Sequence, residues 1–297
     1  MQKIALSANL ELSRIAYGLW RSTDDVDQSS QHLQAKIEAC LQQGITSFDQ
    51  ADIYGGYSAE ALLGKTLKQA PQLRDQMQII TKCNIVAPTG IHSDKSIKHY
   101  NSSAPYITAA VDRSLREMAI DSIDLLLLHR PDPFMDADAT GAALDALIAA
   151  GKVKAIGVSN FRPWDCELLQ SRTQNPLLTN QIEISLTANS ALTNGDLAHM
   201  QQQRITPMAW SPLGGGQLFN QPQSPLTAKL QQIAKHQTVE PSAVAIAWLL
   251  KHPAKIIPIM GSNNIQRIQR FCQALQVELD RQTWFELLEA ATGKAVA

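Results

Sequence analysis

Residues 124–160 have the sequence DLLLLHRPDPFMDADATGAALDALIAAGKVKAIGVSN, in which two apolar runs flank a helical pattern. The runs at 124–129 and 153–159 carry apolar residues at consecutive positions, as parallel strands buried on both faces do. Between them, Ala139–Ala150 predicts a helix that stops at Gly151, a residue type favoured just after a helix end. A strand, a helix and a second strand in this order indicate an α/β fold with a parallel sheet.

The same alternation extends over the rest of the chain. Helical patterns with apolar residues on one face occur at Gln31–Gln43, followed by Gly44, and at Pro105–Met118. The strands predicted from short apolar or β-branched runs number eight: Arg14–Tyr17, Ile45–Asp49, Met77–Lys82, Asp124–His129, Val153–Ser159, Leu178–Glu183, Ile205–Trp210 and Ile256–Met260.

Eight strands alternating with helices predict a (β/α)8 TIM barrel, an α/β fold that we expect to form a single domain over residues 1–297. A doubly wound open sheet is the structural alternative, and it is expected to carry GxGxxG after its first strand. The first predicted strand leads instead into the segment Gly18–Ser22, which contains one glycine. The barrel is therefore favoured.

Composition excludes several classes of protein. The chain has 26 Lys and Arg against 27 Asp and Glu, a net charge of −1, so no excess of positive charge is available to bind nucleic acid or an anionic membrane. Its longest apolar run, Ala243–Leu250, is far shorter than the roughly 20 residues that cross a bilayer. The beginning of the chain lacks the apolar segment of a secretory signal. We expect a cytoplasmic protein.

The four cysteines, Cys40, Cys83, Cys166 and Cys272, are widely spaced and form no CxxC motif. A chain of this length can build its own core without disulfides, so reduced thiols are expected. No metal site is predicted.

Three ionisable residues stand at the carboxyl ends of successive predicted strands: Asp49, Lys82 and His129. Tyr54 follows Asp49 by five residues. In a parallel barrel these strand ends open on one face, so the four side chains are expected to converge. Taken singly, each has a structural alternative: an aspartate that caps a helix, a solvated lysine, or a histidine satisfied within the core.

Such a set can serve as a proton donor beside a carbonyl group. A free tyrosine hydroxyl has a pKa near 10, and a neighbouring ammonium from Lys82 is expected to lower it. Asp49 would keep Lys82 charged. His129, donating from a ring nitrogen, would orient a substrate carbonyl toward Tyr54.

Together these residues belong to a set of segments that resembles the aldo-keto reductase superfamily over about residues 14–270. The segments are FDQADIYG (48–55), the Lys82 of ITKCN, DLLLLH (124–129), GVSNF (157–161), Gln181 and AWSPLGGG (209–216). The resemblance implies a (β/α)8 barrel that binds NADPH without a Rossmann fold. It also implies Tyr54 as general acid with Asp49, Lys82 and His129 as catalytic partners.

The resemblance further implies the cofactor contacts. Ser159, Asn160 and Gln181 would bind the nicotinamide carboxamide, and Trp210 would stack on the ring, with core packing as its structural alternative. A pyrophosphate could approach the backbone of a segment with few side chains, although a flexible loop is the alternative there. The residues of that segment are Ser211, Leu213, Gly214, Gly215 and Gly216.

At the adenosine end the resemblance assigns Ser262 and Arg267 to a 2′-phosphate. Arg270 is three residues further on, and on a helix both arginines could face one phosphate; two solvated arginines are the alternative. The chain departs from the family pattern in having Gly261 where a lysine is common and Arg270-Phe271 near the usual Glu-Asn pair. Because Ser262 and Arg267 match the 2′-phosphate residues, NADPH/NADP+ is preferred, with NADH as the second option.

Two other departures are Gln50 in place of a threonine and Trp210 in place of a tyrosine. Trp20, after the first strand, is expected to line the substrate pocket, with a place in the core as the alternative. Specificity is expected to reside in Cys83–Ala104, Pro131–Asp138, Pro212–Pro225 and the C-terminal residues.

We therefore predict an NADPH-dependent oxidoreductase that reduces an aldehyde or ketone to an alcohol. One alternative is a Schiff-base lyase with Lys82 as nucleophile. Another is a regulatory subunit that retains cofactor but turns over little. The sequence identifies neither the carbonyl substrate nor the oligomeric state. The resemblance is compatible with a monomer.

Overall fold

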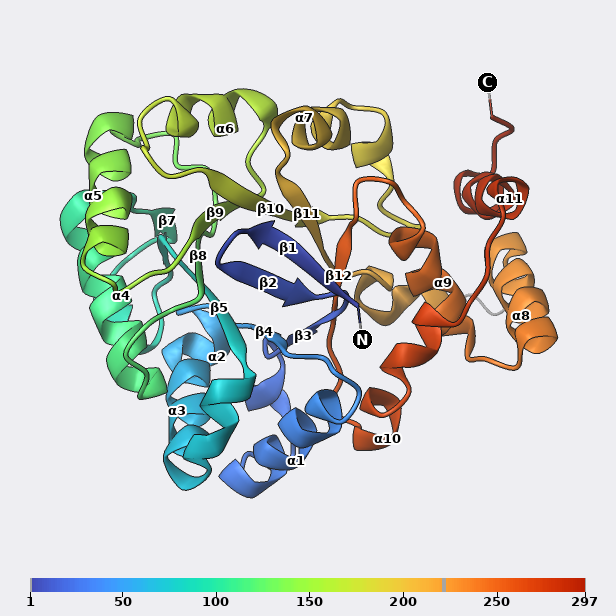
Figure 1. Cartoon of the computed structure of the whole chain (residues 1–297), viewed down its shortest axis with the longest axis horizontal. Coiled ribbons are helices and arrows are strands. Elements are labelled where there is room, and N and C mark those ends of the chain that lie inside the picture. Colours follow the sequence, from blue (N-terminus) through green and yellow to red (C-terminus); the bar gives the residue numbers. More distant parts are fainter. Residues whose placement is uncertain (1, 221–222, 297) are drawn as a thin grey trace.

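The computed structural model describes residues 2–220 and 223–296 and contains a closed barrel of eight parallel strands (Figure 1). Each strand pairs with its neighbour in chain order, and the last pairs with the first. The predicted (β/α)8 fold is confirmed. The strands are β3 (Ala16–Gly18), β4 (Ser47–Asp49), β5 (Gln78–Cys83), β8 (Leu125–Leu128), β9 (Ile156–Ser159), β10 (Leu177–Glu183), β11 (Thr206–Trp210) and β12 (Ile257–Met260).

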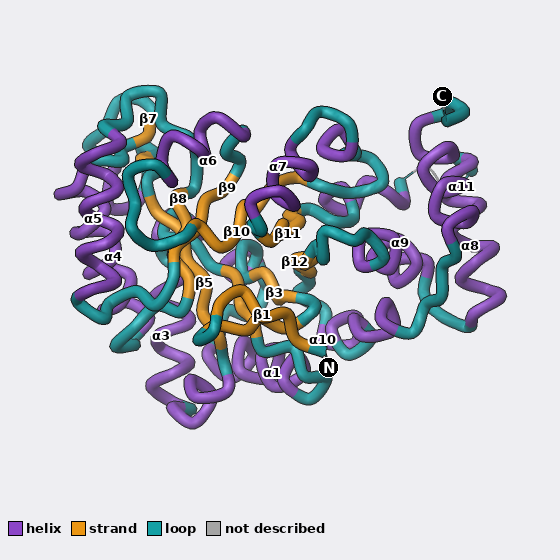
Figure 2. The backbone as a smooth tube through the Cα atoms, turned by 45° about the horizontal axis from the view of Figure 1, so that its top comes forward, coloured by secondary structure: helices purple, strands orange, loops and turns teal. Residues whose placement is uncertain are grey.

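Helices cover the outside of the barrel (Figures 1 and 2). The predicted segments at 31–43, 105–118 and 139–150 correspond to α1 (Ser30–Leu41), α4 (Ala104–Met118) and α5 (Ala137–Ala149). The other helices are α2 (Tyr54–Tyr57), α3 (Ala59–Gln69), α6 (Pro163–Gln170), α7 (Asp196–Gln203), α8 (Pro225–Gln237), α9 (Pro241–Leu250), α10 (Ile265–Ile268) and α11 (Arg281–Thr292).

The strands are apolar on both faces because both faces are packed. In β8, for example, all four leucines are buried: Leu125 and Leu127 belong to the cluster inside the barrel, and Leu126 and Leu128 to the cluster under the helices. Outside, α3 and α4 approach so closely that a Cβ at Gly64 would lie 1.8 Å from the Glu117 carbonyl oxygen. Only glycine fits at that position.

An N-terminal hairpin that the sequence analysis did not predict lies across the centre of the ring in Figure 1. Its strands are β1 (Lys3–Ser7) and β2 (Leu10–Ser13), which are antiparallel. Ile4, Leu10 and Leu12 pack on the apolar residues inside the barrel. Because the chain passes from β2 almost directly into β3, the hairpin closes the amino-terminal end of the barrel and leaves the carboxyl ends of the strands open.

The two long loops have structure of their own. The segment 83–104 contains a short antiparallel pair, β6 (Ile85–Val86) and β7 (His99–Tyr100). In the segment 212–225, a 3-10 helix runs over Gly214–Phe219; residues 221–222 of this predicted loop lie outside the described residues.

The C-terminal helix α11 packs against α8 and α9, at the side of the barrel (Figure 1). Trp284 of α11 stacks on Trp248 of α9 with ring centroids 4.8 Å apart. Each indole N–H donates to the other residue's carbonyl oxygen, at 3.1 and 2.9 Å. No helix in the described part of the chain has the length and apolar character needed to cross a membrane.

Candidate active site

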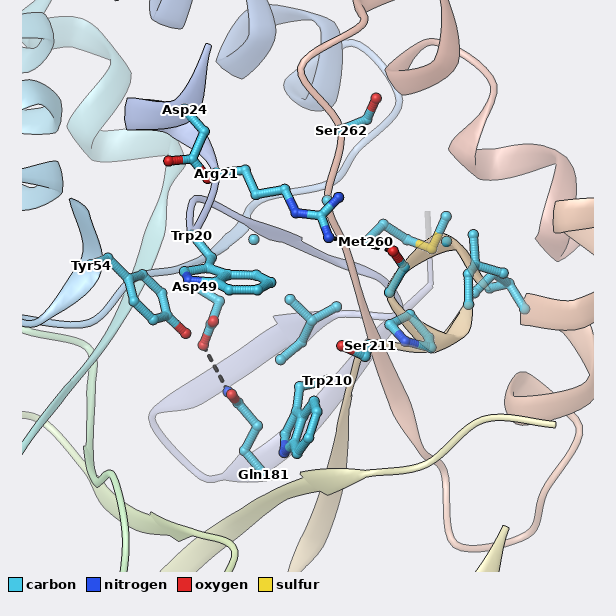
Figure 3. A pocket seen from close by; sticks show the side chains of 18 of the residues that line it. Trp20, Arg21, Asp24, Asp49, Tyr54, Gln181, Trp210, Ser211, Met260 and Ser262 are labelled. Atoms are coloured by element: carbon cyan, nitrogen blue, oxygen red, sulfur yellow. Dashed lines mark hydrogen bonds between the residues drawn. The ribbon is translucent and has the colours of Figure 1, made fainter. Parts of the chain in front are cut away.

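A cavity of about 1270 Å³ opens at the carboxyl ends of the strands (Figure 3). Among the residues predicted to be catalytic or to contact cofactor or substrate, Lys82 is buried below the cavity surface and Gly214 does not border the cavity. All the others line it: Trp20, Asp49, Tyr54, His129, Ser159, Asn160, Gln181, Trp210, Ser211, Leu213, Gly215, Gly216, Ser262 and Arg267. The barrel thus brings together residues that span more than 240 positions of sequence.

The Lys82 ammonium joins the residues at the base of the cavity. Its Nζ donates to Asp49 Oδ2 and to the Gln50 carbonyl oxygen, each at 2.8 Å, and to the Tyr54 hydroxyl oxygen at 3.0 Å. Asp49 ends β4, Lys82 lies near the end of β5, and Tyr54 begins α2. The Lys82 side chain has no exposed surface, so it is not a solvated lysine.

Burial acts to lower the pKa of Lys82, but Asp49 and Tyr54 outweigh it, and the pKa of Lys82 is raised above its ordinary value. The lysine therefore stays an ammonium at neutral pH. A Schiff base requires a neutral, accessible amine, whereas this one is charged and makes three hydrogen bonds. The lyase alternative is disfavoured on both grounds.

The prediction that the pKa of Tyr54 falls below its ordinary value is wrong. Burial raises the pKa of Tyr54 above 10, and the opposing effect of the Lys82 ammonium is smaller. The phenol consequently holds its proton at neutral pH, as a proton donor must. Lys82 still lowers the pKa relative to a phenol buried alone, and its N–H could stabilise a phenolate at this position.

His129 follows β8 and borders the cavity beside Tyr54; the two rings meet edge to face with centroids 6.0 Å apart. Its Nδ1 is buried and has no hydrogen-bond partner among the described residues, so it is not a histidine satisfied within the core. Burial, and after it Lys82, Arg130 and Lys98, lower its pKa well below 6.5. The imidazole is therefore neutral and can donate one hydrogen bond to a ligand oxygen.

A chain of hydrogen bonds links the remaining polar residues at the ends of β9, β10 and β11. Gln181 Nε2 donates to Asp49 Oδ1 at 2.7 Å, the contact drawn in Figure 3. Ser159 Oγ donates to the Gln181 carbonyl oxygen at 2.8 Å, and Asn160 Nδ2 donates to Ser159 Oγ at 2.7 Å. The Trp210 indole N–H donates to Asn160 Oδ1 at 3.0 Å. Trp210 is only partly buried and borders the cavity, so it is not a core residue.

Backbone conformation also sets these strand ends apart. Asn160 and Ser211 have φ of +61° and +47°, values that residues other than glycine rarely adopt. Residues held in such conformations cluster at ligand-binding sites, where packing and hydrogen bonds over-determine them.

The segment after Ser211 fits an anionic group. Gly214, Gly215 and Gly216 all have positive φ, and a Cβ at Gly215 or Gly216 would meet no atom within 4 Å. The backbone there is bare and faces the cavity at Gly215 and Gly216. Together with the Gln181 and Asn160 amides, this supplies the donors and acceptors that a nicotinamide and a pyrophosphate need. The residues present therefore fit a dinucleotide.

At the other end of the cavity, Ser262 and Arg267 lie on the lining as the resemblance implied. The expectation that Arg270 shares a helix face with Arg267 is wrong, because α10 ends at Ile268. Arg270 also lines the cavity, but its Nη1 is paired with Glu240 Oε1 at 2.6 Å. Arg267 is thus the better placed of the two for a phosphate.

Trp20 is 54% exposed, which excludes its placement in the core. Of the segments expected to determine specificity, Cys83–Ala104 contributes Ile85 and Lys98 to the lining, and 131–138 contributes no described residue. From the second long loop Pro212, Leu213, Gly215, Gly216 and Phe219 line the cavity. None of the described C-terminal residues after Ala274 reaches the cavity, since α11 docks on α8.

Three cations of the lining were not predicted from the sequence: Arg21, Lys98 and Arg130. The Arg130 guanidinium lies 6.0 Å from the centroid of the Trp210 ring, and the Asn84 side chain fixes the Arg130 backbone with bonds of 2.8 and 3.1 Å. The only available signal was the position of Arg130 directly after His129, at a strand end.

Comparisons with known proteins point to one family. The family model described as Aldo/keto reductase family matches residues 14–291. The chain is 62% identical to the 6-dehydroglucose reductase of Agrobacterium fabrum, with 100% of both chains covered. It is 37% identical to the 6-dehydroglucose reductase of Novosphingobium aromaticivorans, over 97% of this chain and 94% of that relative.

A solved structure has the same fold. The crystal structure of the thermostable aldo-keto reductase Tm1743 with the inhibitor epalrestat superimposes with a TM-score of 0.83. The alignment covers 98% of this chain and 100% of that one, at 24% identity, so the likeness concerns the fold alone.

Proposed function

Since this chain belongs to the aldo/keto reductase family of oxidoreductases, we propose that it reduces a sugar aldehyde to the alcohol with NADPH, using Tyr54 as proton donor. The observation that carries the proposal is the Tyr54 hydroxyl, which borders the cavity and lies 3.0 Å from the buried Lys82 ammonium. A protonated phenol at that point can transfer a proton to a carbonyl oxygen while the ammonium stabilises the phenolate left behind.

Neutral His129 would donate a hydrogen bond to the same carbonyl oxygen and so aim it at Tyr54. Its lowered pKa supports this role, because an uncharged imidazole adds no repulsion against Lys82. Asp49 would hold the ammonium in place through Oδ2 while Gln181 fixes Oδ1. In this proposal His129 positions the carbonyl oxygen, Asp49 and Gln181 hold the Lys82 ammonium, and Tyr54 donates the proton.

Different lining residues suit different parts of the NADPH molecule. Ser159, Asn160 and Gln181 would hold the carboxamide, Trp210 would stack on the ring, and the backbone of Gly215 and Gly216 would hold the pyrophosphate. When bound, the reduced nicotinamide supplies hydride to the carbonyl carbon. Free thiols at the four cysteines support a reducing compartment, the cytoplasm.

Preference for NADPH over NADH is assigned to Arg267, which lines the cavity and, unlike Arg270, has no acidic partner among the described salt bridges. Arg267→Ala is expected to raise KM for NADPH by roughly 10- to 100-fold, because a hydrogen bond to a charged group contributes about 1.5–3 kcal/mol. KM for NADH, which lacks the 2′-phosphate, stays unchanged. Initial rates with both cofactors measure the effect.

Arg270→Ala is the matched control for Arg267, because its guanidinium is occupied by Glu240. A smaller rise in KM for NADPH is expected there. If Arg267→Ala raises KM for NADPH and NADH equally, the assignment of the 2′-phosphate to Arg267 is wrong.

The substrate class follows from two supports. Both reductases reported above are named for 6-dehydroglucose, which is glucose with an aldehyde at C6. Lys98 and Arg130 line the cavity, act on the pKa of His129 and supply N–H donors, while Trp20 lines the cavity with a side chain that is more than half exposed. Donors beside an aromatic face suit a compound with several hydroxyl groups better than an apolar aldehyde.

The direct test is NADPH oxidation, followed by absorbance, with 6-dehydroglucose and with benzaldehyde. We expect the sugar aldehyde to have the higher kcat/KM. Absence of turnover with every aldehyde, despite NADPH binding, would favour the regulatory subunit instead.

Arg130→Met is expected to lower kcat/KM for 6-dehydroglucose by roughly 10- to 100-fold, since it removes the donor that would bond a hydroxyl group of the sugar. The kcat/KM for benzaldehyde should change little. Arg281→Met, an exposed arginine on α11, is the control and leaves both values unchanged. An equal loss for the two aldehydes would assign Arg130 to the Trp210 side of the cavity rather than to the sugar.

A further inference from the structure

Arg113 of α4 contacts both flanks of the short helix that carries Tyr54. Its Nη2 donates to Asp52 Oδ2 at 3.1 Å, two residues before Tyr54. Its guanidinium carbon lies 5.8 Å from the centroid of the Tyr57 ring, three residues after Tyr54. One side chain on a neighbouring helix thus holds the segment from both ends.

The segment needs external support, because it cannot hold its own conformation. α2 comprises four residues, and its two central glycines have φ of +60° and +61°, outside the helical range. Tyr57, which is not glycine, has φ of +72°. Helices this short are unstable by themselves, and a left-handed non-glycine residue persists only where its surroundings impose it.

One flank is in turn hydrogen-bonded to the strand that carries Lys82, and the other to the segment that follows this strand. The Asp52 backbone N–H donates to the Lys82 carbonyl oxygen at 3.0 Å. The Tyr57 hydroxyl donates to the Ile85 carbonyl oxygen at 3.0 Å and accepts from the Ala87 N–H at 3.0 Å. A shift of either flank would therefore move Tyr54 relative to Lys82.

Burial makes the contact between Arg113 and Asp52 important for the local structure. The Asp52 side chain has no exposed surface and that of Arg113 is 15% exposed. Burial and the nearby Glu60 raise the pKa of Asp52, and Arg113 counteracts them. Glu60, on α3, accepts a hydrogen bond from Thr81 Oγ1 at 2.6 Å, next to Lys82 in β5. Arg113 thus bonds to Asp52 and also acts to lower the pKa of Glu60.

We infer that Arg113 is a positioning residue, whose contacts with Asp52 and Tyr57 set the Tyr54 hydroxyl against Lys82 Nζ. The inference rests on the proposed role of Tyr54 as the proton donor. Arg113 does not border the cavity, so it touches neither substrate nor cofactor. Its effect should therefore fall on the chemical step and spare binding.

The test compares Arg113→Met, Arg113→Lys and Arg116→Met, the last being an exposed arginine on the same helix. We expect Arg113→Met to lower kcat by roughly 10- to 100-fold, since misplacement by about 1 Å has costs of this order. KM for the aldehyde, and Kd for NADPH measured by calorimetry, should stay unchanged. Arg113→Lys should restore part of kcat, and Arg116→Met should match the wild type. A wild-type kcat in folded Arg113→Met overturns the inference.

Arg113→Met leaves Asp52 buried without a cation, and the variant can fail to fold. The double variant Asp52→Asn/Arg113→Met removes both charges while Asn keeps the shape of Asp and Met keeps the apolar stem of Arg, and its kcat should still fall. A wild-type kcat in this double variant contradicts the inference equally.

A crystal structure of the double variant tests the inference apart from turnover. We expect the Tyr54 hydroxyl to have moved away from Lys82 Nζ. Retention of the 3.0 Å contact would overturn the role of Arg113, whether or not the wild type reduces an aldehyde. Absence of turnover in the wild type would instead contradict the proposed function.

Discussion

Tyr54→Phe is expected to lower kcat by about 10²–10⁴-fold, the range attributed to a positioned general acid. The change removes a single oxygen atom. Lys82 keeps its bonds to Asp49 and to the Gln50 carbonyl oxygen, so the base of the cavity should retain its geometry. Stopped-flow and steady-state measurements of NADPH oxidation give kcat, and calorimetry gives Kd for NADPH, which should not change.

Tyr100→Phe is the matched control for Tyr54→Phe, since it removes the same oxygen from a tyrosine in β7 that does not line the cavity. It should turn over like the wild type. Undiminished kcat in Tyr54→Phe, with the variant folded, would show that another group donates the proton.

Lys82→Met is expected to abolish turnover and to destabilise the fold as well. The Asp49 and Lys82 side chains are 4% and 0% exposed, so removing the ammonium leaves a buried carboxylate without its cation. Breaking such a pair by removing one partner costs roughly 3–5 kcal/mol of the free energy of unfolding. Guanidinium-induced unfolding of the wild type and the variant measures the loss.

The double variant Asp49→Asn/Lys82→Met separates the two effects. With both charges removed, much of the lost free energy of unfolding should return, but turnover should not. If Lys82→Met alone unfolds at the wild-type denaturant concentration, the ion pair contributes far less to stability than its burial implies.

The barrel could be predicted because its strands are buried on both faces. A run such as Leu125–Leu128 has no exposed position, so its four leucines stand together in the sequence and identify the strand directly. Parallel strands also place their carboxyl ends on one face, which is why Asp49, Lys82 and His129 could be grouped before any distance was known.

Features that depend on pairing between distant segments escaped prediction. Asp52 and Arg113 are 61 residues apart, and neither position carries a periodic signal that points to the other. Arg270 was expected beside Arg267, but its partner is Glu240 of a different segment. The direction of the pKa shift of Tyr54 depends on burial, which a strand-end position in the sequence does not reveal.

The N-terminal hairpin was not predicted from the sequence for a different reason. Its apolar residues alternate with polar ones over only a few positions on each strand, a short pattern that also occurs in loops. Its assignment depends on the open end of the barrel that it covers.

The stacked pair Trp248–Trp284 gives the molecule a built-in optical label for its C-terminal helix. Two stacked, nearly parallel indoles with centroids 4.8 Å apart interact as coupled transition dipoles, and neither borders the cavity that Trp20 and Trp210 line. The circular-dichroism signal of this pair should therefore vanish when α11 detaches and should remain when a ligand enters the barrel. Detachment of the C-terminal helix and occupancy of the pocket can thus be followed separately in the same sample.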